Sequence, residues 1–81
     1  MTRILSARVL RAQRVGETGR VHAVVRLLVE TRPGGGMDQV DVTVAAPGQA
    51  PGAAPLRHRL LSAAKLAFAA APTAYLSRRA A

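Results

Sequence analysis

Hydrophobic and polar residues alternate along the middle of the chain. Between positions 21 and 29 every odd residue is apolar, and the run is rich in valine. Such alternation is typical of a β-strand with one buried face. A second alternating run contains Val40, Val42 and Val44, and residues 32–36 between the runs, Arg-Pro-Gly-Gly-Gly, are typical of a turn. Two strands joined by a short turn pair antiparallel, so this part of the chain predicts a β-hairpin.

Residues 3–15 show a weaker pattern. A helical wheel spreads their apolar residues around the cylinder, so no single apolar stripe appears. Residues 16–19, Gly-Glu-Thr-Gly, supply a second turn. We therefore expect a first strand that leads into a three-stranded meander, with a short helix as the alternative.

The period of the pattern changes after a linker rich in proline and glycine. From residue 56 the apolar residues recur at helical spacing on one face. Pro55 suits the first helical position, and Pro72 is expected to end or kink the helix. In the basic tail that follows, Tyr75 and Leu76 are expected to fold back onto the core.

Together these elements predict one α+β domain over residues 1–81, with β-β-β-α order. Its parts are a three-stranded antiparallel β-meander (3–45), a linker (46–55), a helix (56–71) and a tail (72–81). One helix covers one face of such a sheet, which we call the inner face; the uncovered side is the outer face. The apolar residues assigned to the inner face are Leu5, Ala7, Val9, Val21, Ala23, Val25, Leu27, Val29, Val40, Val42 and Val44.

Alternation assigns four large aliphatic residues to the outer face, Ile4, Leu10, Val24 and Leu28. An apolar centre with an arginine rim is typical of protein–protein interfaces, although scattered surface aliphatics are also ordinary. The first functional hypothesis is therefore a small interaction protein of adaptor, accessory or inhibitor type, which docks through this face on a protein partner or on a second copy. The predicted partner-binding residues are Ile4, Arg8, Leu10, Arg14, Val24, Arg26 and Leu28.

The charge balance supports a second hypothesis. The 81-residue chain has 12 Lys and Arg against 4 Asp and Glu, a net charge of +8. Arginine bias also follows from a GC-rich coding background, but so basic a domain attracts polyanions. With one Phe, one Tyr and no Trp there is no stacking platform. The alternative is thus a sequence-tolerant nucleic-acid-binding protein that uses Arg3, Arg8, Arg11, Arg14, Arg20 and Arg26.

The residues that carry catalytic or metal chemistry do not form a recognisable constellation. There is no cysteine, and His22 and His58 lie far apart in sequence. Glu30 and Asp41 are close enough to meet across the predicted hairpin, but Arg26 and Arg32 are near enough to neutralise them, so a solvated ion pair is expected rather than a carboxylate dyad. We therefore expect no enzyme activity, no metal site and no cofactor.

The longest apolar stretch is too short to cross a bilayer and is broken by Lys65 and Pro72. A membrane partner is therefore not expected, and a cytoplasmic location is the default expectation. The alternative for residues 1–14, which are rich in arginine and free of acids, is an organellar transit peptide.

Overall fold

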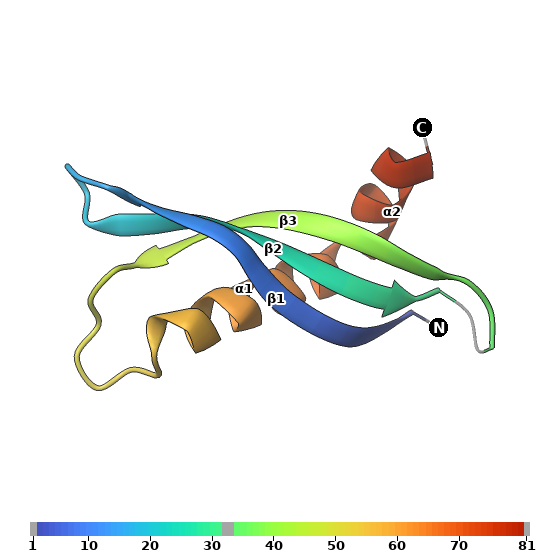
Figure 1. Ribbon diagram of the computed structural model, residues 1–81, viewed down its shortest axis with the longest axis horizontal. Helices are drawn as coiled ribbons and strands as arrows, with labels where there is room; N and C mark the ends of the chain where they lie inside the picture. The colour runs from blue at the N-terminus through green and yellow to red at the C-terminus, as the bar shows by residue number, and fades with distance from the viewer. Residues whose placement is uncertain (1, 32–33, 81) are drawn as a thin grey trace.

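The computed structural model describes residues 2–31 and 34–80, with side chains up to residue 76. Three strands, β1 (Arg3–Val15), β2 (Arg20–Glu30) and β3 (Met37–Pro47), are followed by two helices, α1 (Leu56–Ala70) and α2 (Pro72–Ala80). The strands form one antiparallel sheet in the order β1-β2-β3, and α1 packs across one face of it (Figure 1). The predicted α+β meander with a C-terminal helix is confirmed, and residues 3–15 form a strand.

The central strand β2 carries the strictest alternation. Its odd residues, from Val21 to Val29, are all buried on the inner face. The pairing of β2 with β3 runs without a break from Arg20 opposite Pro47 to Glu30 opposite Met37. Val40 and Val42 on β3 are therefore also buried against the helix. Here period-two alternation predicts the correct face for every residue.

Strand β1 pairs with β2 less regularly. The register shifts between Ile4 and Ser6, and again between Val9 and Arg11. Each shift adds one residue to β1, as a β-bulge does, so the alternation of faces is reset at Leu5 and at Leu10.

The two shifts correct the face predicted for three residues. Ile4 lies opposite Val29 and packs against the core, so its assignment to the outer face is wrong. Leu5, expected in the core, is 39% exposed. Arg14 lies opposite Val21, on the inner-face side of the strand beyond the core, so its assignment to the outer face is also wrong.

The turns have the geometry that their glycines favour. Gly19 has a positive φ of 69° and donates its N–H to the carbonyl of Val15 at 3.0 Å, which closes the β1–β2 turn. The β2–β3 turn is closed by Thr31, whose N–H donates to the carbonyl of Gly36 at 3.4 Å. Arg32 and Pro33 of that predicted turn lie outside the described residues.

Helix α1 closes the core with three residues spaced four apart. Leu60, Ala64 and Phe68 are at most 3% exposed, and they contact the valines and Leu27 of the inner face. Arg59 fixes the start of the helix to the linker: its Nε donates to the carbonyl of Ala54 at 2.9 Å, and its Nη1 to that of Pro47 at 2.7 Å.

Pro72 separates the two helices, as predicted. The segment predicted only as a basic tail is the second helix, α2. Tyr75 and Leu76 pack against the core as expected, and the Tyr75 ring lies 6.0 Å from that of Phe68. The helices therefore extend the inner-face core and leave the outer face of the sheet uncovered.

Candidate nucleic-acid interface

The outer face is built from cross-strand rows of three side chains. The second bulge shifts the register of β1, so odd-numbered residues of β1 occupy the rows nearest the β1–β2 turn, where strict alternation predicts even-numbered ones. Starting from the β1–β2 turn, the rows are Val15–Arg20–Pro47, Gln13–His22–Ala45, Arg11–Val24–Thr43, Arg8–Arg26–Asp41 and Ser6–Leu28–Gln39, followed by Arg3, Glu30 and Met37.

Five arginines share this face, and two of them are paired with acids. Arg26 donates from Nε to Oδ1 of Asp41 at 2.8 Å and from Nη2 to Oδ2 at 3.1 Å. Arg3 lies 3.4 Å from Glu30. Within residues 2–31 and 34–76, no acidic side chain lies within ion-pair distance of the other three arginines of the face, Arg8, Arg11 and Arg20.

The ion pair confirms the sequence interpretation of these acids. Asp41 is held by Arg26 across the hairpin instead of forming a dyad with Glu30. The Asp41 carboxylate raises the pKa of the Arg26 guanidinium above its ordinary value, first through the hydrogen bond and then through its charge. Arg26 is therefore a permanent cation whose charge is shared with one acid.

The predicted apolar patch is smaller in the structure than in the sequence analysis. With Ile4 in the core, its large members on the outer face are Val24 and Leu28, both half-buried, and the same strand places Arg26 between them. Leu10, the fourth predicted member, is half-buried at the second bulge. The centre of the face is therefore an arginine flanked by aliphatic residues.

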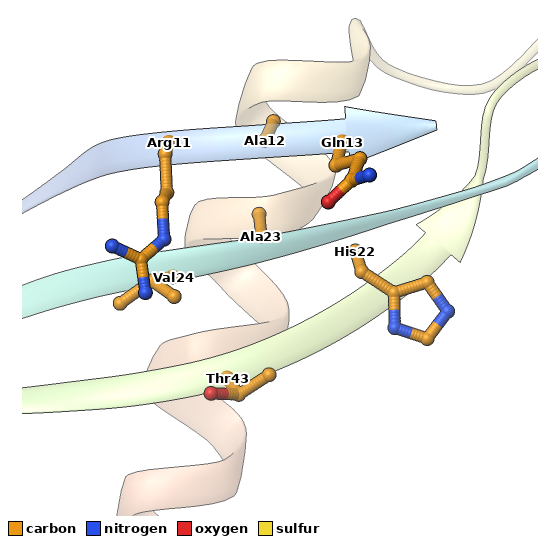
Figure 2. A pocket seen from close by; sticks show the side chains of 7 residues that line it. All are labelled: Arg11, Ala12, Gln13, His22, Ala23, Val24 and Thr43. Carbon is orange, nitrogen blue, oxygen red and sulfur yellow. The ribbon is translucent and has the colours of Figure 1, made fainter. Parts of the chain in front are cut away.

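A shallow hollow of about 370 Å³ opens on the outer face near the β1–β2 turn. Arg11 and Gln13 extend toward it from β1, His22 and Val24 from β2, and Thr43 from β3, with α1 behind the sheet (Figure 2). A second hollow of about 270 Å³ continues along the face and is lined by Ser6, Arg8, Arg26, Leu28 and Gln39.

The structure thus brings together five of the six arginines predicted for nucleic-acid binding and separates the sixth. Arg14 lies near the start of the linker, where a Cβ on Gly48 would come within 2.9 Å of its Nη1. Gln13, His22 and Thr43 were not among the predicted site residues. Nothing in their local sequence singles them out, because their proximity depends on the register of all three strands.

Other kinds of site find no support in the described part of the chain. No group of three His, Cys, Asp or Glu residues there is placed to hold a metal ion. No helix in that part is long and apolar enough to span a membrane. Comparisons with protein-family models, curated proteins and solved structures found no match.

Proposed function

We propose that the protein binds nucleic acid through the outer face of its sheet. The observation that carries the proposal is the placement of Arg3, Arg8, Arg11, Arg20 and Arg26 on one uncovered face with only two acids. Phosphate contacts by arginine supply most of the affinity of non-specific nucleic-acid binding. Arg8, Arg11 and Arg20, which have no acidic partner among the described residues, are the cations that this mode of binding requires.

Docking on a protein remains a prediction, with less to support it than the sequence indicated. A protein–protein interface has an apolar core that is depleted in charge. Here Arg26 interrupts the aliphatic residues of β2, and Ile4 is in the core. The outer face is therefore more complementary to phosphates than to an apolar surface.

Salt dependence gives the first test. If Arg8, Arg11 and Arg20 each neutralise one phosphate, the logarithm of the affinity for a random duplex falls with that of the salt concentration with a slope of about −2.7. Affinity then drops about 40-fold between about 50 and 200 mM salt. Fluorescence anisotropy with a labelled random-sequence duplex measures this slope.

Two double variants remove the same charge from opposite sides of the molecule. R8Q/R20Q removes two cations from the outer face, and the slope is expected to fall to about −0.9. R57Q/K65Q removes two from the exposed side of α1 and is expected to leave the slope unchanged.

Comparing the two variants shows whether the duplex binds one defined face or is attracted by the net charge of the whole molecule. Equal losses in the two variants would mean that the net charge, rather than the outer face, attracts the duplex. Absence of binding at low salt would refute the proposal outright. Thermal unfolding of both variants establishes that they fold.

A further inference from the structure

The side chains of the outer face differ from row to row along the sheet. Arg8 and Arg20 stand in rows at either end of the first hollow. The two rows between them present Arg11, Gln13, His22, Val24 and Thr43. The hydrogen-bonding and aliphatic side chains of these two rows thus lie between a row that contains Arg8 and a row that contains Arg20.

The polar groups in the two central rows are available to a ligand. Among the described residues, no hydrogen bond joins the side chains of Arg11, Gln13, His22 or Thr43 to another protein group. Arginine pairs with guanine O6 and N7, glutamine with adenine N6 and N7, and aliphatic or threonine methyl groups contact the thymine methyl. The central rows therefore hold the side-chain types that recognise base edges in a major groove.

The dimensions of the face fit duplex DNA. Three strands at about 4.8 Å spacing measure about 10 Å between the outer strand axes, so the sheet lies over a major groove about 12 Å wide and its side chains, not its backbone, reach into the groove. From the Arg8 row to the Arg20 row is about 20 Å along the strands, the rise of about six base pairs. Sheet faces and β-ribbons are established readers of DNA grooves.

Other nucleic acids fit less well. The chain's Phe68 and Tyr75 lie on the helices, away from the outer face. The face therefore has no Phe, Tyr or Trp on which single-stranded bases stack. The major groove of duplex RNA is too deep and narrow for side chains to read.

We propose, resting on the nucleic-acid function above, that the outer face recognises a site of about six base pairs in the major groove of duplex DNA. Arg11, Gln13, His22 and Thr43 contact the base edges, Val24 contacts thymine methyl groups, and Arg8 and Arg20 contact phosphates on either side. The binding is thus sequence-selective, in contrast to the sequence-tolerant binding of the alternative hypothesis drawn from the sequence.

Selection from a random duplex DNA library tests the inference with the intact chain. We expect enrichment of one short motif, bound about 100-fold more tightly than a permuted duplex, because each good base contact discriminates by roughly 5- to 150-fold. Replacing guanine in the motif by 7-deazaguanine removes a major-groove acceptor and should weaken binding about tenfold.

Matched variants assign the selectivity to the central rows. Q13A/T43A removes one amide and one hydroxyl there and should reduce the preference for the motif over a permuted duplex at least tenfold. S6A/Q39A removes the same groups from the next row beyond Arg8 and should leave the preference unchanged. Ser6 and Gln13 lie on β1, and Gln39 and Thr43 lie on β3. All four side chains are exposed, so the fold is expected to persist in both variants.

The outcomes distinguish this inference from the proposed function. Salt-dependent binding without an enriched motif, or preference for single strands or duplex RNA, would overturn the inference and leave nucleic-acid binding standing. A motif that S6A/Q39A disrupts as strongly as Q13A/T43A would overturn the assignment of the central rows. Absence of any binding at low salt would remove both proposals.

Discussion

The ion pair between Arg26 and Asp41 allows a gain of function to be predicted. Asp41 engages the guanidinium of the central arginine with two hydrogen bonds. D41N removes the negative charge and is expected to release Arg26 to contact a phosphate. Because both side chains are substantially exposed, the fold should be little affected.

The expected gain in duplex affinity follows from the number of phosphates that the arginines contact. A fourth contact changes the expected salt slope from about −2.7 to about −3.6. If a contact contributes nothing at about 1 M salt, it tightens binding about 15-fold at 50 mM and about 4-fold at 200 mM. The affinity gain of D41N should therefore shrink as salt rises.

The assay is anisotropy with a random duplex, and Asp38 provides the matched control. Asp38 pairs with Val29, on the inner-face side of β3, so D38N adds the same charge without releasing an outer-face arginine. The double variant R26Q/D41N should return the slope to the wild-type value. An equal gain in D38N and D41N, or an unchanged slope in D41N, would refute the assignment of Arg26 to the interface.

Three further predictions concern the scaffold that holds this face. F68A removes the largest buried side chain of α1 and should cost about 3–5 kcal/mol in the free energy of unfolding, measured by urea denaturation. G48A places a Cβ 2.8 Å from the backbone oxygen of Gly19 and should cost about 1–3 kcal/mol, whereas G16A, which meets nothing within 4 Å, should be nearly neutral. R59L removes two hydrogen bonds to linker carbonyls and should lower the unfolding free energy by about 1 kcal/mol, with a thermal midpoint lower by about 4–8 °C.

The sequence predicts β2, β3 and α1 well because their burial patterns are regular. Strict alternation fixes the faces of β2, and the unbroken pairing carries that assignment to β3. The four-residue spacing of Leu60, Ala64 and Phe68 similarly fixes the buried stripe of α1. In these elements local periodicity and tertiary packing agree.

Strand β1 and helix α2 show where local periodicity is insufficient. A bulge changes the face of the residues around it, and its position depends on pairing with a neighbouring strand. Ile4 and Arg14 were misplaced for this reason. Helix α2 is short and begins at a proline, and only Tyr75 and Leu76 signal its contact with the core, so propensity alone did not reveal it.

The second bulge also determines on which face of the sheet Arg11 lies. Strict alternation from Ala7 and Val9 would place Arg11 on the inner-face side, in the position opposite Ala23 that Ala12 occupies. The extra residue at Leu10 instead brings Arg11 to the outer face, opposite Val24.

The register of β1 therefore determines which functional hypothesis the face supports. The first bulge lets Ile4 join the core, which removes an aliphatic residue from the predicted docking patch. The second brings Arg11 and Gln13 to the outer face beside His22 and Thr43. Composition alone left protein docking and nucleic-acid binding open. Two single-residue shifts in one strand favour nucleic-acid binding over protein docking, because they replace apolar surface with a cation and a hydrogen-bonding amide on the part of the uncovered face near the β1–β2 turn.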